Sequence, residues 1–572
     1  MNTPEVNITS EQINDLPLLL GIMEEMGIRG HIDSQIEQHG SWAGLSAGSM
    51  IVIWLSYMLS ERDHRMVAVR EWANQRAQVL NELLGIQLRE TDMSDDRLAR
   101  VLSKVGDETV QARIDTAMVQ SWITVYALPS ETIRLDSTSV SVYSEVNEAG
   151  ELIHYGHSKD HRPDLGQFKV MLSSLDPMGM PLGSAVVGGE RADDGLYVPM
   201  YEQSVAILGK RNVLVVGDSK MAALGTRGHI VAGGSAYLCA YRPVGSRHDV
   251  ADWVEQALQH PQDWQTMTEI EASTGEIQTT ALVYEWTRPQ SWTGADQPQV
   301  MDWTERVLVV RSEQLHHSLC HKRRARWASL AQALSDLGLP PARGRKRYRT
   351  RAELQNKVDD LLAHHDFTGL VTLHLVEETL PTGTTRWTVG SFALDPAAWQ
   401  ASLQRLGWLV YLTNTSSAQY DTPALLWNYR HQVFIERSFS RLKTRHLSIR
   451  PLFVRDEQRI SGLTWLLCLA LRVLTLTEFR LRSALQQHHQ ALTGLNPAIP
   501  SQATNRPTTE RVIHAFQNLT LTLVQMGTLI IRHVTPLSST QNHILALLNL
   551  PPDLYARLTR LPPNLSLSLF ES

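Results

Sequence analysis

This sequence has few of the residues that mark secreted or metal-cluster proteins. Its 572 residues include only three cysteines, Cys239, Cys320 and Cys468. Their scattered positions match neither a disulfide framework nor a zinc cluster. The first residues also lack the basic-then-apolar pattern of a secretory signal. We therefore expect a protein of a reducing cytoplasm.

Long hydrophobic runs are also scarce. The best candidate for a membrane span is LTWLLCLALRVLTLTEF, residues 463–479. This run is short for a bilayer, and Arg472 interrupts it. It predicts a buried helix, and no membrane partner is expected.

The sequence has no excess of positive charge and no nucleotide-binding loop. The formal net charge is −6, which argues only weakly against nucleic acid because binding depends on local patches. The segment GSAVVGGE (183–190) has the glycine spacing of a phosphate loop but lacks its Lys-Ser/Thr pair. No ATP-like cofactor is expected.

The order of the expected elements predicts an α/β core that is interrupted by an insertion. The length indicates roughly three or four domains. Alternating or continuously apolar runs predict strands at 131–144, 167–176, 181–189, 211–221 and 235–242, with a helix between the third and the fourth. The predicted parts are a helical N-terminal domain (1–125), the first part of the core (126–242), a β-rich insertion (243–405), the second part of the core (406–482) and a helical C-terminal region (483–572).

The insertion combines predicted hairpins with concentrated positive charge. Two basic segments, HKRRARW (321–327) and RGRKRYRTR (343–351), lie between its hairpins. Eight of the fifteen tryptophans fall in this part of the chain. The segments are either solvated helix faces, as most charge runs are, or DNA contacts.

Three acids stand where acids are unusual. Asp136 lies in the strand IRLDSTSV, Asp218 ends the apolar strand VLVVGDSK, and Glu436 lies in VFIERSFSRLKTR, which is otherwise basic. Each alone is most simply a turn or cap acid, but strand ends are where open α/β sheets place their sites. Carboxylates without His or Cys form a hard-oxygen site, which favours Mg²⁺ or Mn²⁺ and, with two ions, phosphoryl transfer.

A spacing of seven residues links Glu436 to two further polar residues. Tyr429, Glu436 and Lys443 would lie within about 40° of one another on a continuous helix. One interpretation is a solvated face with a weak Glu–Lys pair. The other is a metal-binding carboxylate flanked by groups that hold phosphate, with the neighbouring cations, Arg437 among them, neutralising a polyanionic backbone.

These segments together resemble bacterial insertion-sequence transposases of the DDE class, in the subgroup whose ribonuclease-H-like core has a β-rich insertion before the final glutamate. IRLDSTSVSV and VLVVGDSKM resemble the two aspartate strands, and YRHQVFIERSFSRLK resembles the Tyr-Arg-Glu-Lys signature. YGHSKDHRPDLGQFKVMLSS (155–174) and RPLFVRDEQRISGLTWLLCLAL resemble flanking stretches. One departure is Gln432, which stands at the signature's arginine position.

The resemblance implies a cytoplasmic, nucleoid-associated bacterial enzyme for cut-and-paste transposition. Asp136, Asp218 and Glu436 would hold two Mg²⁺ or Mn²⁺ ions, which would activate water and then a 3′-hydroxyl for strand transfer. The partners would be double-stranded DNA, both terminal inverted repeats and target DNA, and a second copy of the chain. The expected phosphate-binding residues are Tyr429, Lys443, Arg437, Lys159 and Arg162. Trp303 and Trp292 are candidates for stacking on a flipped base, and core packing is the alternative for each.

Three rival interpretations remain open from the sequence. One is a metal-dependent nuclease of the same fold that cuts without joining. Another is a DNA-binding protein with a degenerate site. The third is a zinc hydrolase built on HYGHSKDH (154–161), although glycine and a nearby proline favour a loop there.

Overall fold

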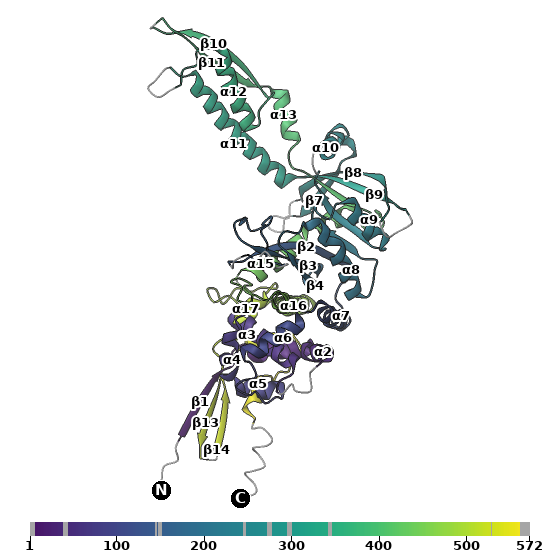
Figure 1. Ribbon diagram of the computed structural model, residues 1–572, viewed down its shortest axis with the longest axis vertical. Helices are drawn as coiled ribbons and strands as arrows, with labels where there is room; N and C mark the ends of the chain where they lie inside the picture. The colour runs from purple at the N-terminus through teal and green to yellow at the C-terminus, as the bar shows by residue number, and fades with distance from the viewer. Residues whose placement is uncertain are drawn as a thin grey trace. The chain divides into compact units, whose positions relative to one another are not determined.

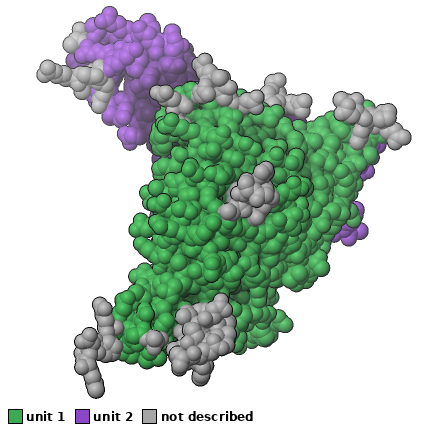
Figure 2. Space-filling view, turned by 60° about the horizontal axis from the view of Figure 1, so that its bottom comes forward, with its two compact units in different colours: residues 1–238, 292–301, 424–572 green, residues 239–291, 302–423 purple. Residues whose placement is uncertain are grey.

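The chain forms two compact units. The computed structural model describes residues 6–560 apart from 38–43, 144–145, 147–151, 244–247, 271–276, 295–299, 341–345, 382, 445 and 528. Unit 1 comprises residues 1–238, 292–301 and 424–572, and unit 2 comprises residues 239–291 and 302–423 (Figure 2). All three candidate acids therefore belong to unit 1.

A mixed sheet forms the centre of unit 1, with the strand order β4-β3-β2-β5-β6. The strands β2 (Thr132–Ser141), β3 (Gln167–Leu175) and β4 (Met180–Gly188) pair antiparallel, and β5 (Leu214–Gly217) joins β2 in parallel. Helix α8 (Tyr197–Leu208) precedes β5, and α9 (Leu224–Ala232) precedes β6 (Ala236–Tyr241). The mixed α/β character predicted for this part of the chain is confirmed.

The long apolar helix α16 (Glu457–Gln487) is a core element of unit 1 (Figure 1). It is long and apolar enough to cross a membrane, but 94% of its most apolar window is buried inside the protein. Arg472 is fully buried and donates to Asp115 at 2.5 Å, to the Pro181 carbonyl at 3.0 Å and to the Leu182 carbonyl at 2.6 Å. Because these acceptors satisfy the guanidinium, the arginine joins α16 to α7 (Glu108–Val125) and β4 instead of breaking the apolar run. The predicted buried helix is confirmed.

The N-terminal part of unit 1 is a group of helices with one strand ahead of them. The helices are α1 (Leu16–Glu25), α2 (Ile28–Gln35), α3 (Ala47–Glu61), α4 (Met66–Asn74), α5 (Ala77–Leu84), α6 (Asp95–Val105) and α7 (Glu108–Val125). The strand β1 (Val6–Gln12) was not predicted from the sequence. Its side chains are mostly exposed, so it carries little hydrophobic signal.

The expectation of a wholly helical C-terminal region is wrong. Residues beyond α16 include β13 (Thr520–Met526) and β14 (Leu529–Val534), besides α17 (Thr509–His514), α18 (Ser539–Leu547) and the 3₁₀ turn η3 (Ala556–Thr559). Strand β13 pairs with both β14 and β1, so the two ends of the chain share one sheet (Figure 1). The alternation in TLTLVQM and LIIRHV is a strand pattern that the helical prediction missed.

Unit 2 holds the predicted hairpins and three substantial helices. Strands β7 (Gln265–Ile270), β8 (Ile277–Trp292), β9 (Met301–Ser312) and β12 (Trp408–Thr413) follow the order β12-β9-β8-β7, and β10 (Val371–Thr379) pairs with β11 (Thr385–Leu394). The helices are α10 (Asp249–Gln259), α11 (Glu313–Gly338), α12 (Arg351–His365) and the shorter α13 (Pro396–Gln404), with a 3₁₀ turn η2 (Pro261–Asp263).

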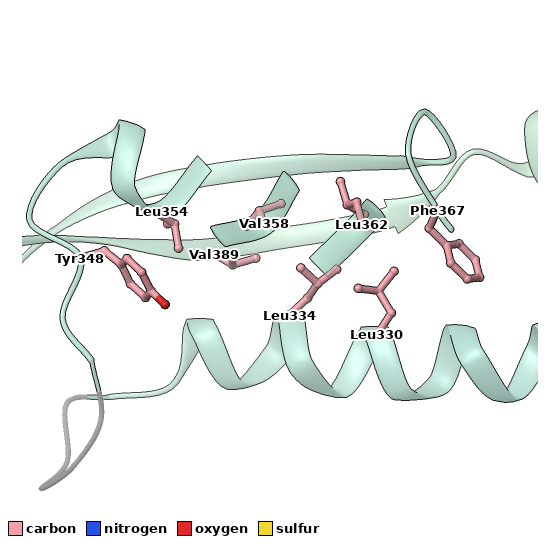
Figure 3. Packing of buried hydrophobic residues seen from close by; sticks show 8 residues of the cluster. All are labelled: Leu330, Leu334, Tyr348, Leu354, Val358, Leu362, Phe367 and Val389. Carbon is pink, nitrogen blue, oxygen red and sulfur yellow. The ribbon is translucent and has the colours of Figure 1, made fainter. Parts of the chain in front are cut away.

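Helices α11 and α12 and the β10–β11 hairpin enclose a hydrophobic core of their own. Leu330 and Leu334 of α11 meet Val358 and Leu362 of α12, with Val389 of β11 alongside (Figure 3). All five side chains are buried. One face of α11 is therefore fixed by packing.

The helix that was predicted to carry Tyr429, Glu436 and Lys443 on one stripe is two helices. Helix α14 (Thr422–Arg430) ends before α15 (Gln432–Lys443) begins. The Asn428 carbonyl accepts a hydrogen bond from the buried Arg134 guanidinium and from the amide of His431 at 3.3 Å. An uninterrupted helix would use that carbonyl for the amide of Gln432. Only Glu436 and Lys443 therefore share the predicted stripe.

Candidate functional site

Asp136 and Asp218 lie side by side because of the pairing of β2 with β5. The two strands are parallel, and Leu135 lies opposite Gly217, so the next residue of each chain segment is an aspartate. The pKa of Asp136 is raised from 3.8 to about 6, mainly by burial; Lys159 lowers it and the neighbouring Asp218 carboxylate raises it. Asp136, in the middle of β2, and Asp218, directly after the carboxyl end of β5, thus interact electrostatically.

Asp218 is held by groups that orient one of its oxygens. The buried Tyr197 hydroxyl of α8 donates to Asp218 Oδ1 at 2.6 Å, and the backbone amide of Lys220 donates to the same oxygen at 2.8 Å. Burial, and then the charges of Asp218 and Asp136, raise the pKa of Tyr197 well above its usual value. The phenol therefore remains a donor at neutral pH.

A lysine ammonium already faces Asp136. The Lys159 Nζ donates to the Ser137 carbonyl at 2.7 Å and to its hydroxyl at 2.8 Å, and lies 3.6 Å from Asp136 Oδ1. It also lies 3.3 Å from Asp193 Oδ2, and the other oxygen of that carboxylate, Oδ1, accepts from the buried Lys169 at 2.7 Å. Burial alone would raise the pKa of Asp193, but these lysines lower it below its usual value. Lys159 therefore supplies a positive charge against the candidate acids.

Helix α15 packs against β2 and carries the third acid. The side chain of Glu436 is exposed and forms no hydrogen bond or ion pair with any residue that the structure describes. Two turns further along α15, Lys443 is part-buried, and its Nζ lies 2.6 Å from Asp160 Oδ1. Asp160 also accepts from Arg450 at 3.3 Å and from Ser141 of β2 at 3.4 Å. The segment around residues 159–160 thus fastens α15 to the strand that carries Asp136.

The three acids do not form a ready-made three-carboxylate site. Among the described residues, no three His, Cys, Asp or Glu side chains lie close enough to hold a metal ion together. Asp136 and Asp218 fit a hard divalent cation, because a cation between them would relieve the charge repulsion that raises the Asp136 pKa. Glu436 stands apart from this pair, on the solvent side of its helix.

The residues predicted to bind phosphate are placed differently from one another. Arg437 points into unit 1 and forms a double hydrogen bond with Glu478 of α16, at 2.7 and 3.0 Å. Arg162 is half-buried and pairs with Asp164 at 2.7 Å. Tyr429 is half-buried in α14. Of the five, Lys159 lies beside Asp136 itself, at 3.6 Å from its Oδ1. Lys443 is linked to β2, the strand that carries Asp136, through Asp160 and Ser141.

Of the two tryptophan candidates, Trp292 belongs to unit 1 and Trp303 to unit 2. Trp292 packs over α9, where its ring covers Gly228 so closely that a Cβ there would lie 2.4 Å from it. Its ring also meets the His229 ring edge-on, with 6.4 Å between the ring centroids. Trp303 is half-buried in β9 of unit 2. Packing therefore accounts for Trp292.

The histidines of HYGHSKDH do not form a zinc site. His154, His157 and His161 are all described, and they belong to no group of three metal-ligating side chains in the described part of the chain. His161 has a positive φ of 57° in a turn, so the segment is a loop and not a helix. The zinc hydrolase interpretation required these histidines to lie on one helix, and residues 154–161 form no helix.

A cavity of about 860 Å³ opens beside α3 and α4 of unit 1, and its lining includes none of the three acids. Its charged groups largely satisfy one another. Tyr57 donates to Asp63 at 2.5 Å, Trp72 donates to Glu61 at 2.8 Å, and Arg76 lies over the Trp72 ring. We assign no chemistry to it.

Sequence analysis missed four residues of this site: Tyr197, Asp193, Lys169 and Asp160. One of them left a visible signal, because Lys169 interrupts the buried strand QFKVMLSSL and a lysine is seldom buried without a partner. Asp193 begins the short 3₁₀ helix η1 (Asp193–Leu196) and Asp160 lies in a turn; their approach to the site depends on the fold, and nothing local marks them.

Comparisons with known proteins add little to this geometry. The model of a domain of unknown function (DUF4277) matches residues 8–116, which span β1 to the first half of α7. No curated protein matches. Among solved structures, a piggyBac transposase synaptic complex with hairpin DNA matches with a TM-score of 0.30 and 8% identity, covering 87% of this chain and 79% of that one. This weak similarity to a transposase is too low to bear on the fold or the function.

Proposed function

We propose that this chain is a metal-dependent DNA transposase that cuts DNA at the ends of a mobile element and joins them to target DNA. The observation that carries the proposal is the adjacent pair Asp136, within β2, and Asp218, directly after the parallel strand β5, with a raised Asp136 pKa. Three antiparallel strands followed by strand–helix units support a ribonuclease-H-like core around that pair.

The proposed chemistry uses the carboxylates as ligands of one or two Mg²⁺ or Mn²⁺ ions. Bound there, the metal supplies an activated water or 3′-hydroxyl and stabilises the leaving oxygen. Asp136 and Asp218 would bind it, with Tyr197 orienting Asp218 through the 2.6 Å hydrogen bond. Glu436 would join when DNA and metal bring α15 closer, and Lys443 and Lys159 would contact phosphate once released from their carboxylate partners.

A second candidate is a nuclease of the same fold that cuts without joining. This candidate is supported by the exposed position of Glu436, apart from the aspartate pair. Two carboxylates alone suffice to hold one metal ion, so a nuclease could work without Glu436. Joined products distinguish the two candidates, since only a transposase links the element's 3′ end to a second duplex.

The test is cleavage of a plasmid that carries the DNA flanking this gene, with and without Mg²⁺ or Mn²⁺. The wild type is compared with Asp218→Asn, Glu436→Gln and the control Glu90→Gln, an exposed acid at the N-terminal helices. We expect metal-dependent cuts at the element's ends that both site variants abolish and the control retains. Cutting that survives Asp218→Asn would refute the site, and cutting without joined products would favour the nuclease.

A further inference from the structure

The basic residues of α11 lie on two faces of the helix, one packed inward and one exposed. Arg323 faces inward: it donates to the Asp366 carboxylate at 3.0 Å and to the Asp366 carbonyl at 3.2 Å, and its guanidinium lies 5.2 Å from the Phe367 ring centroid. Lys322, Arg324 and Arg326 face outward and are exposed. None of these three forms an ion pair or hydrogen bond with a residue that the structure describes.

The outward face of α11 is free of negative charge over most of its length. Helix α11 spans 26 residues, and residues 314–335 contain no Asp or Glu. The chain as a whole carries a net charge of −6, so this is a strong local departure. A face of this kind repels other cationic surfaces and attracts polyanions.

The positions of the charges on the helix follow a definite pattern. At about 100° per residue, the exposed residues Ser318, Ala325 and Ser329 form a narrow strip of small side chains. Lys322 and Arg326 project from one side of this strip, and Arg324 projects from the other. At about 100° per residue, Lys322 and Arg326 lie within about 80° of this strip on one side, and Arg324 lies about 120° away on the other.

The opposite face of α11 is fixed, so the pattern is presented by a rigid element. Leu330 and Leu334 are buried against α12 and β11 in the core drawn in Figure 3. A binding surface on a packed helix loses little side-chain and backbone freedom when a partner binds.

We propose that the outward face of α11 binds double-stranded DNA through its phosphates, without reading sequence. DNA as the partner rests on the proposed function; the surface itself does not. An α-helix of about 10–12 Å diameter fits the major groove of B-DNA, which is about 12 Å wide. The small strip would enter the groove, and the cations on its two sides would contact the phosphates of the two strands. Serine and alanine at the centre carry no bidentate base-reading group, which suits target DNA better than a terminal repeat.

The test measures binding of the full-length protein to a labelled random-sequence duplex in the presence of a chelator, so that no cutting occurs. Arg324→Gln/Arg326→Gln is compared with the wild type and with Arg351→Gln/Lys357→Gln. The control pair removes the same charge from exposed positions of α12, where Glu353, Asp359 and Asp360 lie nearby. All four substituted side chains are exposed, so folding is expected to be retained, and melting temperature verifies this.

The α11 variant is expected to bind roughly tenfold more weakly and to lower the slope of log affinity against log salt by about two, as for two lost phosphate contacts. The α12 variant is expected to match the wild type. Equal losses in both variants would show a net-charge effect and overturn the proposal, as would an unchanged slope for the α11 variant. A duplex RNA of the same sequence should be less sensitive to the α11 change, because its major groove does not admit a helix. Failure of the plasmid cleavage test would leave these binding results unaffected, so the two proposals fail separately.

Discussion

Asp136→Asn is expected to stabilise the folded protein in the absence of metal. Burial raises the pKa of Asp136 from 3.8 to about 6, so the folded state holds this proton more tightly than the unfolded chain does. The group's contribution to stability is therefore greatest below pH about 4 and falls as the pH rises to about 6. Above that, the ionised carboxylate costs about 3 kcal/mol at 1.36 kcal/mol per unit. Asparagine has nearly the same shape and carries no charge to desolvate.

The size of the effect can be measured by thermal unfolding. For a cooperative unit of roughly 400 residues, about 3 kcal/mol corresponds to a rise of about 4 °C in melting temperature. We expect this rise near pH 8 with a chelator present, and about half of it near pH 5, where the folded carboxyl is mostly protonated. Lys159 keeps its bonds to Ser137 and its approach to Asp193 in the variant, so no new unpaired charge arises.

Two comparisons make the reasoning refutable. The exposed Glu90→Gln variant should melt with the wild type at both pH values. Added Mn²⁺ should raise the melting temperature of the wild type more than that of Asp136→Asn, because the metal binds the ionised carboxylate. A variant that melts at or below the wild-type temperature near pH 8 without metal would show that burial of this charge is not costly.

Two further predictions concern other charges of unit 1. Lys159→Met should tighten Mn²⁺ binding near pH 8 by roughly three- to tenfold, because a positive charge 3.6 Å from Asp136 Oδ1 competes with the ion. The electron paramagnetic resonance signal of free Mn²⁺ measures the affinity, with Lys210→Met as the control. Equal affinities of the two variants would contradict the prediction. Arg472→Met should destabilise by about 3–5 kcal/mol, because it leaves the buried Asp115 charge unpaired. Asp115→Asn/Arg472→Met should lose less in thermal unfolding, and a double variant less stable than the single one would contradict this.

Much of the core of unit 1 could be predicted because its signals are local. The strand positions between 131 and 242 follow from alternation and from the apolar run VLVV, and the burial of α16 follows from its length and composition. The strand β1 could not be predicted, because its partner β13 lies some 500 residues away and its own side chains are mostly polar. A strand shows alternating apolar and polar residues only when one of its faces is buried. An exposed strand that pairs with a distant segment therefore has no such pattern.

The break between α14 and α15 shows the same limit at the candidate site. The sequence around His431 has neither proline nor glycine, so local propensity predicts a continuous helix. The interruption depends on Arg134, which is buried with Asp176 at 2.6 Å and also donates to the Asn428 carbonyl. A residue on β2, nearly 300 positions earlier, thus determines that Tyr429 leaves the stripe shared by Glu436 and Lys443. For Asp136 and Asp218, the sequence predicted that both strands belong to one sheet. It did not predict that the two strands pair directly and place the aspartates side by side.

The basic neighbours of Glu436 have counter-ions of their own, and this bears on what Glu436 does. Arg437, Arg441 and Arg482 all donate to or pair with Glu478, and Arg441 also pairs with Glu510 at 2.7 Å. Arg441 holds the pKa of Glu510 at about 2 despite burial that would raise it. These arginines fasten α15 to α16 and α17, so they are not available to deliver phosphate while the helices remain packed. Glu436 consequently neutralises none of them within the described chain. An exposed carboxylate without a partner among the described residues, on a helix that packs against β2, suits the role proposed for Glu436, a ligand that joins only when substrate and metal bind.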